Sequence, residues 1–264
     1  MKRLILYLTL LSVLPVLTGC QREENVRIQG VYYECIGENE IGLPYNSMAM
    51  YGYSSLYYDD RIYISSICDG YNIPTDVFGD EIKTVYGNRD VYWSDEEDKL
   101  DEITCEGTLY QVKGYDDNFR VAVYYNLSNS EDSDNYLVRI YDNLSGITLY
   151  SGGEMFDEKF HLSDSVNIEA GRYGAEERRV LSMEDEKVKS FLNALYDGLF
   201  MDPKAEDYPE LDIEEAYILS FRDANGLPAD IAVYKEGYIS FIDRGLDKMI
   251  VKADASACEN IISD

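Results

Sequence analysis

The feature that most constrains the fold is an amphipathic segment near the C-terminus. Its apolar residues recur at i, i+3, i+4, i+7, i+8 and i+11, and they are Val188, Phe191, Leu192, Leu195, Tyr196 and Leu199. This spacing places them on one face of a helix. Ser182-Met183-Glu184-Asp185 is typical of a helix start, and Asp202-Pro203 of a helix end. Because such an apolar face has to be covered, the helix needs a second layer, and the nearest cover is the chain that follows it.

Four strand-like segments follow this helix, and the turns between them are readable. The segments are residues 216–221, 229–234, 238–242 and 248–252. Asn225-Gly226 is a strong hairpin signal, and Glu236-Gly237 makes a second turn. Residues 256–262 could form a short final helix that buries Cys258. We therefore expect a small α-β-β-β-β-α domain over residues 176–264, with its sheet packed against the long helix.

The preceding part of the chain, residues 30–170, predicts a mostly antiparallel β domain. Strands are expected at residues 31–35, 56–58, 61–65, 81–86, 108–113, 119–125, 136–141 and 147–150. Asp59-Asp60 and residues 114–118 have turn chemistry. Short strands with polar turns favour an antiparallel sheet that is rolled or packed on itself. The expected fold class is α+β, with a domain boundary between Val166 and Val180.

The N-terminus has the composition of an export signal. Lys2 and Arg3 form a charged start, and residues 4–17 are an almost unbroken apolar run of about fourteen residues. A helix needs about 20 apolar residues to cross a bilayer, so this run is too short. A charged start, a short apolar middle and small residues at the end are typical of a secretory signal peptide. We expect residues 1–19 to be removed and residues 20–29 to form a polar tether.

The end of this segment carries a family resemblance. Leu17-Thr18-Gly19-Cys20 resembles the lipobox of bacterial lipoproteins. The resemblance implies cleavage between Gly19 and Cys20, and a diacylglyceryl group on the Cys20 sulfur. Two acyl chains anchor a protein stably, whereas one binds only marginally. The resemblance thus implies a protein held at the extracytoplasmic face of the bacterial cell membrane; the alternative is an ordinary signal peptide followed by a chance cysteine.

A second resemblance concerns the body of the chain. Residues 106–120, with the sequence EGTLYQVKGYDDNFR, resemble uncharacterised lipoproteins of low-GC Gram-positive bacteria. This resemblance implies no activity, and no functional residue is carried over from it.

The charge of the chain excludes one class of partner. The chain has 51 acidic and 23 basic residues and a formal net charge of −28, and loss of Lys2 and Arg3 with the signal peptide makes it more negative. Nucleic-acid binding requires a basic surface, so nucleic acid is not expected as a partner. A cationic peptide, protein or wall component is compatible with this charge, and solubility is the alternative explanation.

Tyrosine is unusually abundant, with 25 residues against 8 phenylalanines. A tyrosine ring has an apolar body and a polar tip, which suits the half-exposed face of a twisted sheet. A tyrosine-rich surface could also bind carbohydrate or peptide. Both interpretations remain open at this stage.

No catalytic, cofactor-binding or metal-ligating residues are expected. His161 is the only histidine, which excludes a histidine-based metal cluster, and its apolar neighbours favour a packed side chain. The sequence contains no G-x-S-x-G, S-x-x-K or phosphate-binding glycine motif. The acidic runs at residues 95–102 and 131–134 lack the order of a calcium-binding loop, so solvated loops are expected there.

Four cysteines follow Cys20, namely Cys35, Cys68, Cys105 and Cys258. In an exported chain they could form disulfides by three alternative pairings, or act as small core residues. The leading functional hypothesis is a non-enzymatic binding or scaffolding protein at the cell envelope. The alternatives are a carboxylate-based hydrolase acting on cell-wall polymers or peptides, and the solute-binding subunit of a transporter.

Overall fold

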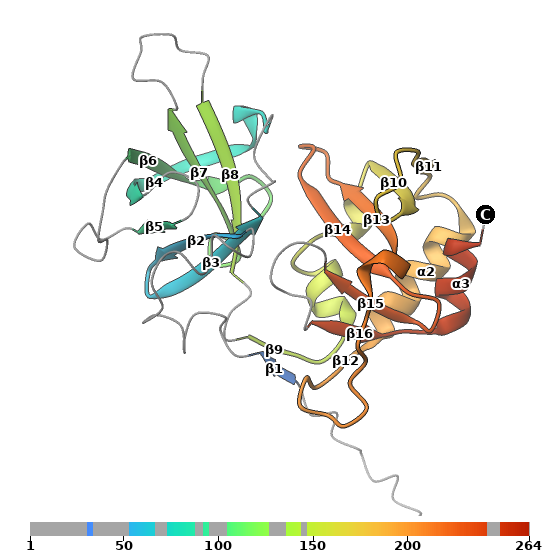
Figure 1. Ribbon diagram of the computed structural model, residues 1–264. Coiled ribbons are helices and arrows are strands. Elements are labelled where there is room, and N and C mark those ends of the chain that lie inside the picture. Colours follow the sequence, from blue (N-terminus) through green and yellow to red (C-terminus); the bar gives the residue numbers. More distant parts are fainter. Residues whose placement is uncertain are drawn as a thin grey trace, which may run out of the picture.

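A computed structural model describes residues 31–33, 53–66, 73–87, 92–94, 105–126, 136–143, 147–241 and 249–263. These residues form two β-rich parts, which are a closed barrel and an open sheet covered by helices (Figure 1). The sheets are mainly antiparallel, and the helices are few and short. The predicted α+β class is confirmed. Cys20, Cys35, Cys68 and the two acidic runs at residues 95–102 and 131–134 lie outside the described residues.

The barrel contains seven strands of the N-terminal half. They are β2 (Tyr53–Tyr58), β3 (Arg61–Ser66), β4 (Phe78–Gly87), β5 (Tyr92–Ser94), β6 (Cys105–Val112), β7 (Arg120–Asn126) and β8 (Tyr136–Asp142). Their order around the barrel is β2-β3-β8-β7-β6-β4-β5. The pair β2 and β5 that closes the ring is parallel, and the other pairs are antiparallel. The rolled sheet expected from the short strands is thus a closed barrel.

The turns of the barrel follow from local sequence. Asp59 and Asp60 have φ angles of +52° and +58°, as a two-residue hairpin turn with two left-handed positions requires. In the β6–β7 turn, the Oδ1 atom of Asp116 accepts hydrogen bonds from the backbone and side-chain nitrogens of Asn118, both at 2.9 Å. These hydrogen bonds lower the pKa of Asp116. Both hairpins lie where the sequence predicts them.

The barrel interior is filled by alternate residues of its strands. On β7, Val121, Val123 and Tyr125 point inward, as a period of two residues requires. The other members of this cluster are Leu56, Tyr63, Val85, Leu109, Leu137 and Tyr141. The residues between them on β6, β7 and β8 therefore face outward.

The C-terminal part is an open sheet of seven strands in the order β11-β10-β13-β14-β15-β16-β12. The strands are β10 (Asn167–Arg172), β11 (Arg179–Leu181), β12 (Leu199–Phe200), β13 (Tyr217–Arg222), β14 (Pro228–Val233), β15 (Tyr238–Phe241) and β16 (Ile250–Lys252). Strands β13 to β16 are the predicted four-strand meander. A separate two-stranded ribbon pairs β1 (Val31–Tyr33) with β9 (Ile147–Leu149).

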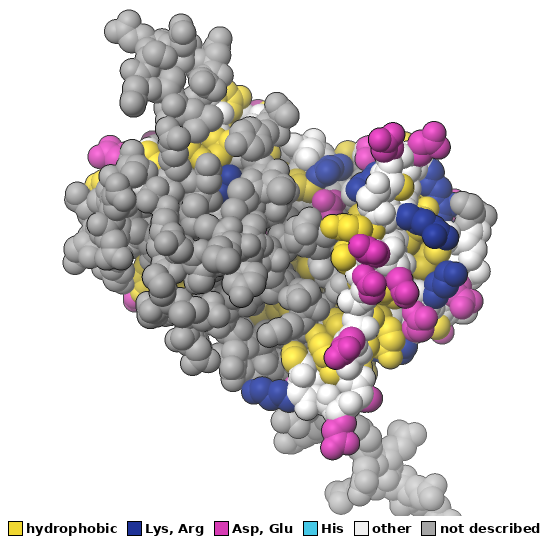
Figure 2. Space-filling view, viewed as in Figure 1, with side chains coloured by type: hydrophobic (Ala, Val, Ile, Leu, Met, Phe, Trp, Pro, Cys, Tyr) yellow, Lys and Arg dark blue, Asp and Glu magenta, His cyan; other side chains and the backbone are white. Residues whose placement is uncertain are grey.

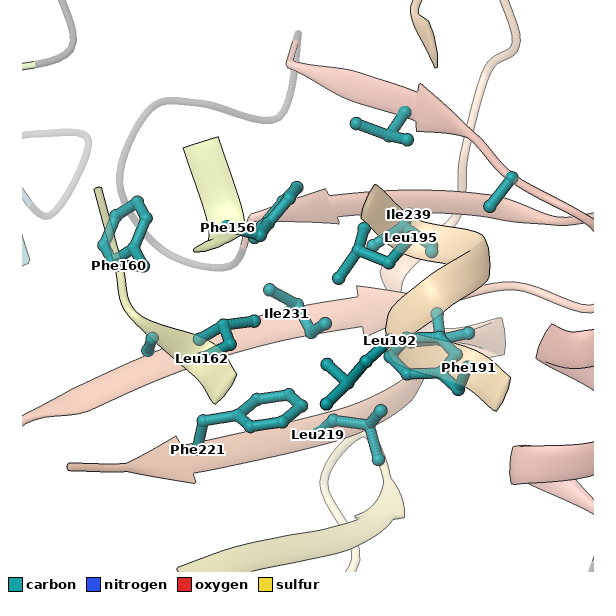
Figure 3. Packing of buried hydrophobic residues seen from close by; sticks show 14 of the residues in the cluster. Phe156, Phe160, Leu162, Phe191, Leu192, Leu195, Leu219, Phe221, Ile231 and Ile239 are labelled. Carbon is teal, nitrogen blue, oxygen red and sulfur yellow. The ribbon is translucent and has the colours of Figure 1, made fainter. Parts of the chain in front are cut away.

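Helices cover one face of this sheet. They are α2 (Glu186–Asp197), α3 (Ala255–Ile262), the π-helix η3 (Gly153–Asp157) and the 3-10 helix η4 (Leu162–Asp164), which share one core cluster. Two further 3-10 helices lie elsewhere: η1 (Thr75–Val77) packs against the barrel, and η5 (Ile213–Glu215) packs against another cluster of the open sheet. Phe191, Leu192 and Leu195 of α2 lie over Leu219, Phe221, Ile231 and Ile239 of the sheet (Figure 3). The sheet thus covers the apolar face of the helix, as its periodicity requires.

The open sheet starts earlier in the chain than the sequence suggests. Strands β10 and β11 occupy the range in which the domain boundary is expected, and β10 pairs with β13 along its whole length. Ile168 and Ala170 of β10 point into the core next to α2. Strand β11 has only three residues, lies at the edge of the sheet and follows a polar turn. Its alternation of buried and exposed side chains is therefore too short to recognise in the sequence.

The long helix is also shorter than expected. It starts after Asp185, whose Oδ1 atom accepts a hydrogen bond from the backbone N–H of Lys187 at 2.8 Å. It ends at Asp197, and Leu199 belongs to strand β12, which pairs with β16. Within the described part of the chain, no helix has the length and apolar character needed to cross a membrane.

Candidate functional site

The outer face of strands β6, β7 and β8 carries apolar and aromatic side chains. Antiparallel register places Thr108 opposite Tyr124, and Tyr110 opposite Ala122. It also places Ala122 opposite Ile140. An outer barrel face with apolar side chains can either pack against another part of the molecule or remain accessible to solvent. The structure shows both, on adjoining parts of this face.

Four rings form a continuous row on this face, which we call the aromatic surface: Phe78, Tyr110, Tyr124 and Tyr136. Phe78 and Tyr110 stack with ring centroids 4.4 Å apart and planes 6° apart. The Tyr124 and Phe78 rings are nearly perpendicular, with centroids 6.1 Å apart, and the centroids of Tyr124 and Tyr136 are 5.4 Å apart. Tyr136 is 39% exposed and the other three rings are half-buried. Aromatic pairs at these distances are stabilising, so the row is both ordered by its own contacts and open to solvent.

Exposed carboxylates border the aromatic surface. Glu81 lies opposite Tyr110 in the β4–β6 ladder, and Glu106 is an exposed residue on the outward side of β6. Asp76 of η1 is exposed and lies two residues before Phe78. Of the nearby lysines, Lys113 donates a hydrogen bond from Nζ to the backbone oxygen of Asp76 at 2.8 Å. Lys83 of β4 is exposed as well, so the three carboxylates near the row outnumber the two lysines and give it a net negative charge.

An adjoining part of the same face packs against the C-terminal part, and Phe78 and Tyr124 of the aromatic surface contact it. Leu227, at the β13–β14 turn, is 2% exposed and belongs to a cluster of barrel residues. The barrel members of this cluster are Val77, Val112, Ala122, Val138 and Ile140. The tip of a hairpin from the open sheet thus lies on the outer face of the barrel.

A buried ion pair lies where the barrel meets the C-terminal part, a region that we call the junction. Arg120 of β7 and Asp142 of β8 are opposite each other in the ladder, and they are 1% and 0% exposed. The guanidinium donates two hydrogen bonds, from Nε to Oδ1 at 2.6 Å and from Nη2 to Oδ2 at 2.9 Å. Parallel hydrogen bonds of this kind are the strong, geometrically specific form of the pair.

Aromatic rings from both parts surround the Arg120 guanidinium. Its Cζ atom lies 4.5 Å from the centroid of Tyr115, 5.0 Å from that of Phe160 and 5.6 Å from that of Phe119. Phe160 belongs to the segment between η3 and η4 in the C-terminal part, whereas the other residues belong to the barrel. Because a cation is attracted to ring faces at such distances, Arg120 contributes to holding the two parts together.

Tyr115 makes a second connection across the junction. Its hydroxyl donates a hydrogen bond to Oδ2 of Asp223 at 3.1 Å. The other oxygen of Asp223 accepts hydrogen bonds from the backbone N–H groups of Asn225 and Leu227, both at 2.8 Å. Burial raises the pKa of Tyr115, and the Asp223 carboxylate raises it further against the opposing effect of Arg120. One carboxylate therefore orders the β13–β14 turn and ties it to the barrel.

The single histidine lies at the same junction. The His161 ring is half-buried, and its centroid lies 5.3 Å from that of Tyr115. Its backbone is left-handed, with φ +53°. The position agrees with the packed side chain expected from its apolar neighbours.

The buried carboxylate that the structure describes is part of a structural ion pair. Asp142 is the one buried carboxylate within the described ranges, and Arg120 occupies both of its oxygens. An isolated, buried Asp–Glu pair, which would favour the hydrolase alternative, does not occur among these residues. No group of three or more His, Cys, Asp or Glu side chains that could hold a metal occurs among them either.

Comparison with known proteins does not assign the chain to a family. No family model matches the chain, and neither the curated proteins nor the solved structures contain a significant match. The functional interpretation therefore depends on the residues of this chain.

Sequence reasoning identified the tyrosine abundance but not which tyrosines share a surface. The outward alternation of Thr108, Tyr110 and Val112 in β6 is a usable signal, since every second residue of a strand shares one face. The register that adds Tyr124 and Tyr136 could not be read from the sequence. The predicted lipidation residue Cys20 lies outside the described part of the chain.

Proposed function

We propose that the protein is a lipid-anchored extracytoplasmic protein with a non-enzymatic binding or scaffolding role at the cell envelope. The observation that carries the proposal is Leu17-Thr18-Gly19-Cys20 at the end of a short apolar run with a basic start. Cleavage before Cys20 and attachment of diacylglyceryl to its sulfur would leave two acyl chains in the outer leaflet of the cell membrane. Two chains suffice for stable anchoring.

The aromatic surface supports the binding part of the proposal. Tyrosine and phenylalanine are enriched in protein interfaces, because they bury a large area at a low cost in side-chain entropy. In this protein four such rings form one row on a closed barrel, and the outermost ring is 39% exposed. The buried junction at Arg120 supports a fixed placement of this surface relative to the C-terminal part.

The length of the tether limits how far the folded parts reach from the membrane. Strand β1 starts at Val31 and pairs with β9, so about ten residues separate it from Cys20. A flexible segment of this length spans on the order of 16–19 Å. The folded parts would therefore lie close to the membrane surface, within reach of partners at the envelope.

Cell fractionation of the wild-type protein and a Cys20→Ser variant tests the anchor. We expect the wild type in the membrane fraction, with incorporation of labelled palmitate, and the variant without label. The matched control is Cys105→Ser, at a partly buried cysteine whose thiol donates a hydrogen bond to the backbone oxygen of Gly87. A serine hydroxyl can make the same bond, so this variant should leave both the label and the fractionation unchanged. Equal labelling of the wild type and Cys20→Ser would exclude Cys20 as the lipidated residue.

A further inference from the structure

We infer that the aromatic surface binds a cationic peptide segment rich in lysine or arginine. The inference rests on the proposed binding role, and it does not depend on the lipid anchor. Its basis is the combination of a row of accessible rings with carboxylates at its border, which matches the two parts of a lysine or arginine side chain. Such side chains pack an apolar stem along a ring and keep a charged end in polar surroundings.

The rings offer faces as well as edges. Phe78 and Tyr110 are stacked with their planes 6° apart, and both are half-buried. The Tyr124 and Tyr136 rings are tilted by 33° relative to each other, and Tyr136 is the most exposed of the four at 39%. A cation within about 6 Å of a ring centroid is attracted to the face of the ring. The protein already uses this interaction at its junction, where the Arg120 guanidinium lies 4.5 Å from Tyr115. The exposed rings can make the same kind of contact with a cation from outside.

The charges around the aromatic surface favour a positively charged partner. Glu81 is opposite Tyr110 in the ladder, Glu106 lies on the same side of β6, and both are exposed. The amine of Lys113 is held on the backbone oxygen of Asp76 and leaves the Asp76 carboxylate at the border. The whole chain has more than twice as many acidic as basic residues. An anionic partner would be repelled, and a cationic one would be attracted before contact.

The extent of the surface indicates an extended segment as the partner. The row runs from β4 across β6 and β7 to β8, and it adjoins the part of the barrel that Leu227 covers. Four consecutive rings can contact several residues of one extended chain. Figure 2 shows the contrasting situation on the C-terminal part, where acidic side chains alternate with lysine and arginine. That mixed surface does not favour one sign of partner.

Binding of labelled peptides to the purified full chain in a non-ionic detergent tests the inference, because this assay works with or without a lipid on Cys20. The probes are fluorescein-labelled octapeptides of alternating lysine and glycine, and of alternating serine and glycine, measured by fluorescence anisotropy. We expect saturable binding of the lysine peptide only. Tyr124→Ala with Tyr136→Ala should weaken it by about five- to twentyfold, since each exposed cation–π contact contributes about a two- to fivefold factor.

The matched control is Tyr173→Ala, which removes a tyrosine of similar exposure, 43%, from the C-terminal part. It should bind the peptide like the wild type. Glu81→Gln with Glu106→Gln should weaken binding and reduce its dependence on salt, while circular dichroism checks that each variant is folded. The inference is wrong if the lysine peptide does not bind, if the serine peptide binds equally well, or if Tyr173→Ala weakens binding as much as the double variant. Cell fractionation would remain a separate test of the anchor.

Discussion

Arg120 and Asp142 form a two-hydrogen-bond ion pair that is almost completely removed from solvent. The two residues are opposite each other on neighbouring strands of the barrel, and the guanidinium also contacts Phe160 of the C-terminal part. A buried charge without its partner is far more costly than a buried pair. The pair therefore makes the junction sensitive to single substitutions.

Arg120→Met should lower the free energy of unfolding by about 3–5 kcal/mol, because it leaves the Asp142 carboxylate buried without its cation. Urea denaturation followed by tyrosine fluorescence measures the loss. The double variant Arg120→Met with Asp142→Leu should recover much of it, because both charges are then removed. A double variant as unstable as the single one would contradict this account of the pair.

Tyr115→Phe removes the hydroxyl that donates a hydrogen bond to Asp223 and keeps the ring, so we expect a loss of about 0.5–1.5 kcal/mol in the free energy of unfolding. Asp223→Ala should be more costly, because it also removes the acceptor for Asn225 and Leu227 in the β13–β14 turn. Thermal unfolding of both variants measures the difference. Equal losses would mean that the turn does not depend on Asp223.

Gly152→Ala should be strongly destabilising for a steric reason. A Cβ atom at this position would lie 1.9 Å from the backbone oxygen of Leu195, so η3 and the end of α2 would have to separate. Overpacking of this kind costs about 1–3 kcal/mol and occasionally more. The neighbouring Gly153→Ala is the control, since its Cβ would meet Tyr196 at an ordinary 3.4 Å. Similar melting temperatures for the two variants would contradict the predicted clash.

Burial raises the pKa of the Cys258 thiol from 9.0 to about 12. The folded protein thus keeps its proton where the unfolded chain releases it. The resulting stability is fully present below about pH 9 and is lost as the pH rises toward about 12, at up to about 1.4 kcal/mol per pH unit. Cys258→Ala should show a shallower decline over this range in urea denaturation. Identical slopes for the wild type and the variant would contradict the raised pKa.

Much of the fold can be predicted from the sequence, because turn residues and helical periodicity depend only on residues that are close together in the chain. Asn225-Gly226 and Asp59-Asp60 determine two hairpins, and the apolar face of α2 requires the sheet that covers it. The closure of the barrel depends on β5, which has only three residues and pairs in parallel with β2. Three residues are too few to show the alternation of buried and exposed side chains by which a strand is recognised in a sequence.

The candidate site was less predictable, because it depends on register between distant strands. Arg120 and Asp142 are separated by 22 positions in the chain, and a charged residue in a strand is normally expected at the surface. Tyr124 and Tyr136 meet only because β7 and β8 pair in one particular register. The sequence shows that tyrosines are abundant, but the register decides which of them form one surface.

The most direct test of the proposed function is mass spectrometry of the mature N-terminus, with the protein purified from bacterial membranes. We predict that the N-terminal peptide starts at Cys20 and carries the added mass of a diacylglyceryl group. The detection of unmodified Cys20 within a longer peptide, or of a mature N-terminus at another residue, would contradict the account.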